Sequence, residues 1–255
     1  MRRLTTLLCA GALVMTGLAC SDDDKTSTSD TSGDDSSTTT SAPEPDGPTD
    51  IATVDWFEPV EPGTYYIDPD GDESTPLRVT WEIAKEGWTG WIGTAKDTGD
   101  DGPHILLTIA ELTNVTVDAC LDQAEGEPAV GPTVDDIAIA LSELAPFEVT
   151  EPPSDVTFLG YEGKHLVLTV PDGAGSAGAI GFTDCQNGEL RTWFAKNFEG
   201  SFVGYDGPKP GLTEEFWILD VDGTRLAIIT NTSPDAPAEA VAERQAMLDS
   251  MRIEA

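Results

Sequence analysis

Two tryptophans that stand among glycines are the residues of this chain best suited to hold a ligand. Trp88 and Trp91 lie in the segment Glu86–Thr94, which also contains three glycines. Flat indole rings can stack on a sugar or hold an apolar peptide, and glycines let a ligand approach closely. The competing interpretation is that both rings fold back and close one end of the core. Trp88 and Trp91 are therefore the candidate ligand-binding residues, on the condition that their rings are exposed.

A glycine-rich stretch offers two catalytic motifs, and both lack their required context. Gly173–Gly178 (GAGSAG) fits the dinucleotide pattern G-x-G-x-x-G, which must open a helix, but the following Ala179–Phe182 is strand-like. Ser176 resembles a nucleophile elbow, yet the catalytic histidine of α/β-hydrolases follows the serine, whereas His104 and His165 precede it. Other orders of a serine triad remain open. We predict no catalytic residue and no cofactor.

Acidic residues are abundant enough to suggest a metal site or a pair of catalytic carboxylates. Asp68–Glu73 clusters oxygen ligands of the kind that Ca²⁺ prefers. An EF-hand loop starting at Asp68 needs glycine at its sixth position and glutamate at its twelfth, but these positions hold Glu73 and Val79. We expect a polar turn and predict no metal ligand, with a weak calcium site as the alternative. A glycosidase-type carboxylate pair remains open, but the excess of acids makes any chosen pair arbitrary.

The net charge limits the partners of the protein. The chain carries 47 acidic and 13 basic residues, which gives a formal charge of −34. Nucleic-acid binding depends on Lys and Arg side chains that neutralise phosphates, so we predict no nucleic-acid partner. The same negative charge argues against direct binding of the protein to anionic lipid headgroups.

The first twenty residues have the pattern of an export signal. Two arginines precede an apolar run, Leu7–Leu18, which is shorter than the roughly 20 residues that span a bilayer as a helix. The sequence GLAC at Gly17–Cys20 resembles the lipobox of bacterial lipoproteins, although Gly17 stands where that family usually has leucine. The resemblance implies that Cys20 is acylated and anchors the protein on the extracytoplasmic face of the cell membrane. An ordinary secretory cleavage after Ala19 is the alternative.

A change in composition after the signal indicates the domain organisation. We expect residues 1–19 to be the signal peptide, 20–50 a disordered tether and 51–255 a single folded domain. Of the thirty residues in Ser21–Asp50, 14 are Ser or Thr, nine are Asp or Glu, and Ala42 is the single apolar side chain. Such a stretch buries too little apolar surface to offset the entropy cost of ordering it.

The cysteines fit an exported protein. Of the four, Cys9 lies in the signal and Cys20 at the expected lipidation site, which leaves Cys120 and Cys185 in the domain. Because disulfides persist in oxidising compartments, we predict a Cys120–Cys185 bridge. A redox or metal-binding pair is the alternative, but neither cysteine lies in a C-x-x-C motif.

Alternation of apolar and polar residues predicts strands over much of the domain. The clearest run is Leu77–Ile83. Shorter strand candidates are His104–Ile109, Asn114–Val117, Val156–Leu159, His165–Val170 and Leu190–Phe194. Asp222-Gly223 between the apolar runs Phe216–Val221 and Thr224–Thr230 predicts a hairpin in the middle of a sheet.

Two helices complete the expected elements. Thr133 and Asp136 form a capping box ahead of an apolar helical face. That face consists of Val134, Ile137, Leu141 and Leu144. A second helix is expected at Pro237–Ser250. The order of elements predicts an α+β fold, with a mainly antiparallel sheet on which a central and a C-terminal helix pack.

Two stretches resemble PsbP-like domains, named for an extrinsic subunit of the photosynthetic oxygen-evolving complex. Val79–Trp88 (VTWEIAKEGW) is similar to their opening strand with its Gly-Trp, and the final hairpin and helix running into Met247–Ile253 are similar to their ending. The resemblance covers about Gly63–Glu254. It implies a sandwich fold that binds or scaffolds rather than catalyses, and it transfers no functional residue.

Together these features favour a membrane-tethered, extracytoplasmic and non-enzymatic binding or scaffold domain. Its partners would be the membrane, through the lipid anchor, and a protein or carbohydrate ligand. Two alternatives stay open, an extracytoplasmic hydrolase that uses a carboxylate pair and a structural envelope protein.

Overall fold

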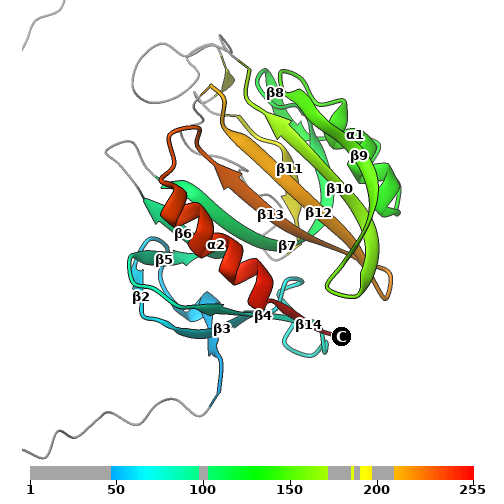
Figure 1. Ribbon diagram of the computed structural model, residues 1–255. Helices are drawn as coiled ribbons and strands as arrows, with labels where there is room; N and C mark the ends of the chain where they lie inside the picture. The colour runs from blue at the N-terminus through cyan, green and yellow to red at the C-terminus, as the bar shows by residue number, and fades with distance from the viewer. Residues whose placement is uncertain (1–46, 98–102, 172–184, 187–189, 197–209) are drawn as a thin grey trace, which may run out of the picture. The chain divides into compact units, whose positions relative to one another are not determined.

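The computed structural model describes residues 47–97, 103–171, 185–186, 190–196 and 210–255 (Figure 1). The expected signal peptide, Cys20, the tether up to residue 46 and the Gly173–Gly178 stretch lie outside these ranges. Strand β1 (Thr49–Asp50) pairs with a strand of the domain. The ordered domain therefore begins before the expected boundary at Ile51.

Most of the described strands belong to one large antiparallel sheet. Its strand order is β2 (Pro59–Val60), β5 (Trp88–Trp91), β6 (Gly93–Asp97), β7 (Pro103–Asp118), β13 (Thr224–Thr232), β12 (Thr213–Val221), β10 (Tyr161–Thr169) and β9 (Glu148–Phe158). The C-terminal half of β7 also pairs with β8 (Asp122–Glu125) and β11 (Trp193–Ala195). β7 is thus the strand that connects the parts of this sheet.

A smaller sheet is built from both ends of the described chain. Its strand order is β1, β3 (Gly63–Ile67), β4 (Arg78–Ile83) and β14 (Arg252–Glu254). β1 and β3 are parallel, and the other pairs are antiparallel.

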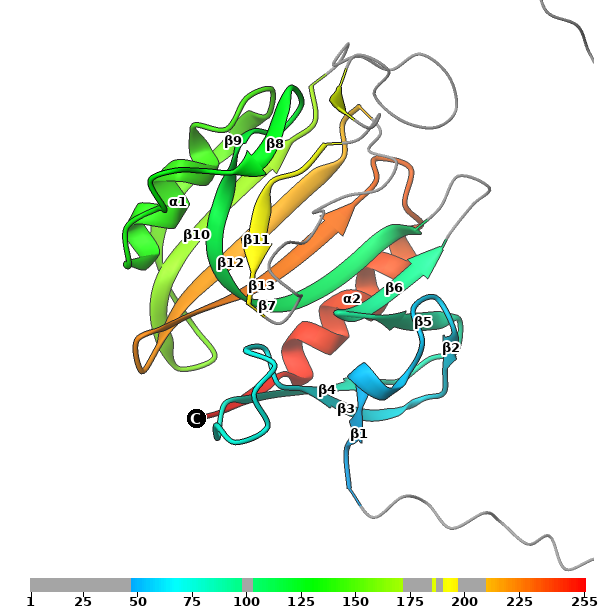
Figure 2. The ribbon, with the colours of Figure 1, turned by 180° about the vertical axis from the view of Figure 1, so that it is seen from behind.

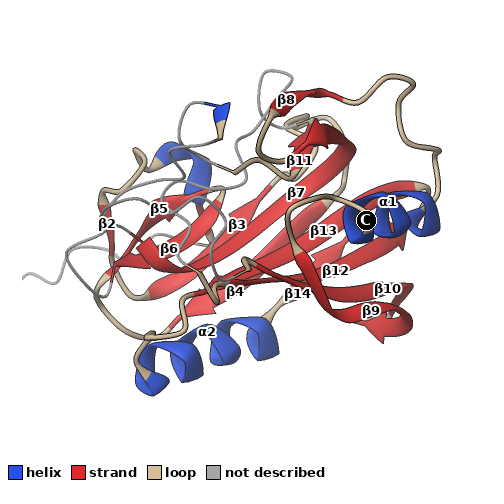
Figure 3. Cartoon of the chain, turned by 90° about the horizontal axis from the view of Figure 1, so that it is seen from above, coloured by secondary structure: helices blue, strands red, loops and turns tan. Residues whose placement is uncertain are grey.

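The two α-helices lie on opposite sides of the large sheet (Figure 3). α2 (Ala238–Ser250) crosses the sheet near β6, β7 and β13 and borders the small sheet (Figure 1). α1 (Val134–Ser142) packs on β9 and β10, and β8 and β11 lie on the same side (Figure 2). The expected fold class, α+β with a mainly antiparallel sheet, is confirmed.

The elements with the strongest local signals form as predicted. The Thr133 hydroxyl accepts a hydrogen bond from the Asp136 amide at 3.2 Å, and the Asp136 carboxylate accepts one from the Thr133 amide at 2.9 Å. In the β12–β13 hairpin, Asp220 faces Arg225. Its turn residues Asp222 and Gly223 have φ of 50° and 87°, as a tight turn between twisted strands requires.

Two strands are longer than the sequence indicated. β7 is one strand of 16 residues where two short ones were expected. Its polar middle does not end it, because the Glu111 carbonyl accepts a hydrogen bond from the Lys196 amide at 3.0 Å. β9 begins at Glu148 and includes Pro152 and Pro153, which a strand at the edge of a sheet tolerates because one row of its amides has no partner strand.

The core lies between the large sheet and the elements that pack on it. Trp81, Trp88, Trp193 and Phe216 are among its largest fully buried side chains. A disulfide joins Cys120 to Cys185 with Cα atoms 4.4 Å apart, as predicted. No helix in the described ranges has the length and apolar character needed to cross a bilayer.

Candidate functional site

The two predicted ligand-binding tryptophans point to opposite sides of β5. Side chains alternate along a strand, so residues three positions apart face away from each other. Trp88 is buried, whereas Trp91 is partly exposed. The structure therefore separates these residues into two places and does not form one site from them.

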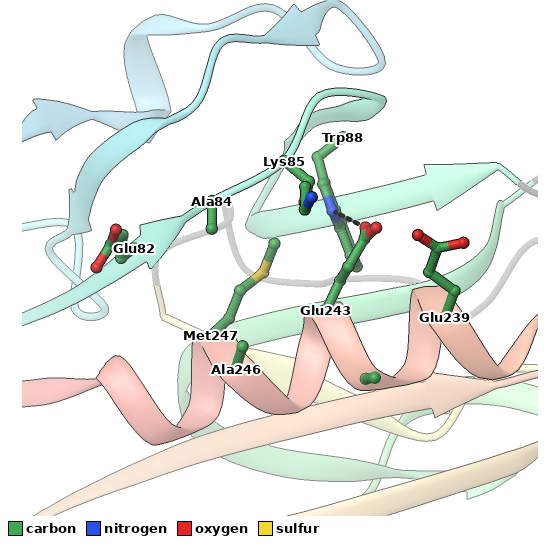
Figure 4. A pocket seen from close by; sticks show the side chains of 9 residues that line it. Glu82, Ala84, Lys85, Trp88, Glu239, Glu243, Ala246 and Met247 are labelled. Atoms are coloured by element: carbon green, nitrogen blue, oxygen red, sulfur yellow. Dashed lines mark hydrogen bonds between the residues drawn. The ribbon is translucent and has the colours of Figure 1, made fainter.

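Trp88 belongs to the core, as the competing interpretation holds, so the condition that its ring is exposed is not met. Its side chain is 0% exposed, and its Nε1 donates a hydrogen bond to Glu243 Oε2 at 3.1 Å (Figure 4). Lys96 Nζ lies 2.5 Å from the same carboxylate oxygen and 5.4 Å from the centroid of the Trp88 ring. The physical reason is α2, which packs over this side of β5.

A groove of about 250 Å³ lies beside Trp88, between α2 and the end of β4 (Figure 4). It remains open because three of the side chains around it, Ala84, Ala242 and Ala246, are small. The groove also touches Glu82, Lys85, Glu239, Glu243 and Met247. Charges of both signs stand at its rim, so its chemistry favours no single class of ligand.

Trp91 joins two other rings in an aromatic cluster, defined as Trp56, Phe57 and Trp91. The Trp91 ring centroid lies 4.9 Å from that of Trp56 and 5.3 Å from that of Phe57. Trp56 is 51% exposed and Phe57 is 50% exposed. The Trp91 ring is held in position by a hydrogen bond, which its Nε1 donates to Thr108 Oγ1 at 3.2 Å. The cluster thus presents two aromatic rings to solvent on a rigid base.

The loop that carries these rings is attached to β5 at Gly90. The Phe57 amide donates to the Gly90 carbonyl at 2.9 Å, and the Gly90 amide donates to the Glu58 carbonyl at 2.9 Å. A Cβ atom at position 90 would lie 2.8 Å from Val54 Cγ1 and 2.9 Å from the Asp55 carbonyl oxygen. Glycine is therefore required at position 90 for the loop to approach the strand.

Phe57 has an unusual backbone conformation. Its φ is 64°, in the left-handed region, where an L-residue other than glycine costs roughly 1–2 kcal/mol. Bulky side chains are rare there. The chain therefore accepts backbone strain at a residue whose ring is half exposed.

A pocket of about 140 Å³ opens beside the aromatic cluster and is here called the indole pocket. It is lined by Ala52, Trp56, Ile67, Asp68, Gly71, Trp91 and Ile92. The Asp68 side chain is 10% exposed, and its Oδ1 accepts a hydrogen bond from Arg78 Nε at 2.9 Å. This contact raises the pKa of Arg78. The Arg78 guanidinium in turn lies 4.7 Å from the centroid of the Tyr66 ring.

Two of the remaining acids of Asp68–Glu73, Asp70 and Asp72, stabilise the turn itself. Asp70 accepts hydrogen bonds from the Asp72 amide at 3.0 Å and from Thr75 Oγ1 at 2.9 Å. Hydrogen bonds from the Ser74 hydroxyl and amide lower the pKa of Asp72. In the described ranges, no group of three or more His, Cys, Asp or Glu residues has an arrangement that could hold a metal ion.

The structure also assembles a histidine cluster that the sequence analysis did not identify. His165 Nε2 lies 2.8 Å from Glu215 Oε1, and His165 Nδ1 lies 3.7 Å from Glu151 Oε2. The Trp217 ring lies 5.3 Å from the imidazole. The sequence holds no signal for this cluster, because its members come from three different strands. Its described contacts are to carboxylates and a ring, with no nucleophile among them.

Glu214, the neighbour of Glu215 on β12, points to the opposite face and is buried. It is 2% exposed, and it accepts hydrogen bonds from Trp193 Nε1 at 3.2 Å and Thr192 Oγ1 at 3.5 Å. Burial raises the pKa of Glu214 to about 7, against the weaker lowering effect of these hydrogen bonds. This carboxyl group is out of reach of a ligand.

Sequence reasoning missed Trp56 and Phe57, which carry most of the exposed aromatic surface beside Trp91. The available signal was Asp55-Trp56-Phe57-Glu58, two adjacent aromatic residues between two acids. One ring of such a pair can enter the core, but acids on both sides indicate a solvent-facing loop.

Comparisons with known proteins add no relative: no family model matches the chain, and neither does a curated protein or a solved structure. The resemblances to bacterial lipoproteins and PsbP-like domains therefore stay predictions.

Proposed function

We propose that this protein is an exported, lipid-anchored binding protein whose folded domain holds a ligand outside the membrane through the aromatic cluster. The signal pattern, the lipobox at Cys20 and the acidic tether support the anchored location. The Cys120–Cys185 disulfide suits an oxidising compartment outside the cytoplasm. The PsbP-like arrangement is part of the same proposal, since that family mostly binds or scaffolds.

The observation that carries the binding role is the strained backbone and exposed ring of Phe57. Strained backbone and an exposed apolar ring both cost free energy, and here they coincide in one residue that β5 holds in place. Proteins keep such costs where a function requires the conformation. A ligand that covers Trp56 and Phe57 would bury this apolar surface and recover part of that free energy.

The alternative functions have less support. Glu214, the carboxyl group among the described residues whose pKa rises to about 7, is buried away from solvent, so a substrate of the hydrolase could not touch it. The exposed rings of Trp56 and Phe57 favour a binding role over a purely structural one.

The binding role is tested by Phe57→Gly in the full-length exported protein. Glycine adopts a φ of 64° without strain, so we expect the free energy of unfolding to stay within about 1 kcal/mol while ligand binding is lost. Binding is measured from the indole N–H signals in NMR spectra, with panels of soluble oligosaccharides and uncharged peptides as probes.

Leu159→Gly is the matched control, because Leu159 also has a positive φ, 51°, but lies in the β9–β10 turn. It should retain binding. Equal binding by Phe57→Gly and the unchanged protein, or no response to either panel, would remove the aromatic cluster as a binding site.

A further inference from the structure

We infer that the aromatic cluster and the indole pocket form a carbohydrate site, in which one neutral sugar ring is held by Trp56, Trp91 and the Asp68 carboxylate. This inference rests on the proposed function and names the ligand class of the same site. Pocket volume, a buried acceptor and aromatic walls support it separately.

Asp68 is the polar anchor of the site. Its side chain is nine-tenths buried, yet only Oδ1 has a hydrogen bond within the described residues, the one from Arg78. Oδ2 is therefore available to accept a hydrogen bond, and a hydroxyl group of a ligand that donates to it would form a charge-assisted hydrogen bond. The carboxylate is already oriented, because Arg78 is held between Asp68 and the Tyr66 ring.

The aromatic walls of the pocket suit the apolar face of a sugar ring. A pyranose ring has an apolar face of C–H groups and an edge of hydroxyl groups, so it needs an aromatic surface and an acceptor side by side. Trp56 and Trp91 line the same pocket as Asp68, and a volume of about 140 Å³ restricts the site to one small ring. The rest of a longer glycan would lie across the exposed Phe57.

Charge distinguishes a neutral sugar from other ligands. Anionic polymers are repelled by the formal charge of −34 and by the exposed acids Asp55 and Glu58 beside the cluster. An ammonium group is disfavoured because Arg78 already neutralises Asp68. An apolar peptide side chain would bury the Asp68 carboxylate without giving it a donor, which is costly.

The test uses the full-length exported protein and two panels of probes: hexamers of glucose, mannose, xylose and N-acetylglucosamine, and the uncharged peptides. Asp68→Asn removes the charged acceptor, and Ala52→Leu narrows the pocket without changing a polar group. Asp55→Asn is the matched control, since it removes one negative charge from the same loop outside the pocket lining. Isothermal titration calorimetry measures Kd, and thermal melts confirm that each variant is folded.

We expect at least one hexamer to bind, and Asp68→Asn and Ala52→Leu each to weaken binding about tenfold or more, while Asp55→Asn changes Kd less than threefold. Sugar binding that both pocket variants retain would overturn the inference by placing the sugar elsewhere. Binding of uncharged peptides but of no hexamer would overturn it and leave the proposed function standing. If neither panel binds, the proposed function fails with it.

Discussion

Trp88 Nε1 donates a hydrogen bond to the Glu243 carboxylate at 3.1 Å, and this contact joins β5 to α2 across 155 residues of sequence. Lys96 meets the same carboxylate from β6, so strand, helix and indole are fixed together. The Trp88 ring is therefore a structural element of the α2 interface, unlike the ring of Trp91 on the other side of the strand.

Trp88→Ala should lower the free energy of unfolding by roughly 3–5 kcal/mol, because it leaves a cavity and a partly buried carboxylate with one donor fewer. In a domain of this size the melting temperature should fall on the order of 10 °C. Trp56→Ala is the control, since a ring that is 51% exposed should cost far less. Equal losses in the two variants would contradict the separation of β5 into a core side and a surface side.

Local patterns predicted those elements whose signals lie within a few residues. The capping box of Thr133 and the Asp222-Gly223 turn are of this kind, and both form as expected. The side of β5 on which each indole lies depends instead on α2, far along the chain. Strand alternation alone indicates that Trp88 and Trp91 diverge, but it does not indicate which of them the helix covers.

The sequence predicted only one member of the candidate site, Trp91, and not the loop that packs against it. Trp91 was identified from its glycine neighbours, but the function of Gly90 is to admit the Val54–Glu58 loop, which supplies Trp56 and Phe57. Glycines in a strand can admit a ligand or another segment of backbone, and sequence alone does not distinguish the two.

Gly90→Ala tests this close approach. The new methyl group would meet Val54 Cγ1 at 2.8 Å and a carbonyl oxygen at 2.9 Å, so the loop must move. We expect a loss of roughly 1–3 kcal/mol in the free energy of unfolding and weaker binding at the aromatic cluster. Gly63→Ala is the control, because the nearest atom to its Cβ would be Tyr65 Cε2 at an ordinary 3.7 Å. Chemical denaturation measures both losses. Equal losses of unfolding free energy in Gly90→Ala and Gly63→Ala would refute the requirement for glycine at position 90.

The Cys120–Cys185 bridge should contribute to stability through the loop that it closes. For the 65 residues of separation, loop-closure entropy predicts a loss of about 4 kcal/mol in the Cys120→Ser/Cys185→Ser double variant. Denaturation curves measure the loss, and mass spectrometry of the non-reduced, exported protein should find the two peptides linked. Free thiols at both positions after export would show that the bridge does not form in the cell.

Lipid anchoring at Cys20 predicts a change in location. Cys20→Ala should release the protein from the membrane fraction or leave an uncleaved precursor, because acyl chains provide the membrane affinity. Cys9→Ala is the control, since the proposal expects Cys9 to be removed with the signal. Membrane fractionation and palmitate labelling report the result, and intact labelling of the Cys20→Ala protein would exclude this residue as the anchor.

Glu214 should make stability depend on pH in a defined direction. Its pKa is about 7 in the folded protein and near the ordinary 4.5 when unfolded, so only the folded state holds this proton between those values. The stabilisation that the protonated Glu214 gives the folded state is fully present below pH 4.5 and is lost as the pH rises through 7. One pKa unit corresponds to about 1.4 kcal/mol, so the total loss is about 3 kcal/mol.

Glu214→Gln removes this titration while keeping an oxygen that accepts from Trp193. The unfolding free energy of Glu214→Gln, relative to that of the unchanged protein, should therefore increase as the pH rises from 4.5 to 7.5. Glu148→Gln, at an exposed position of β9, is the control and should leave the pH profile unchanged. Urea denaturation at several pH values gives both profiles. If the Glu214→Gln profile runs parallel to that of the unchanged protein, Glu214 does not hold a proton in the folded state near neutral pH.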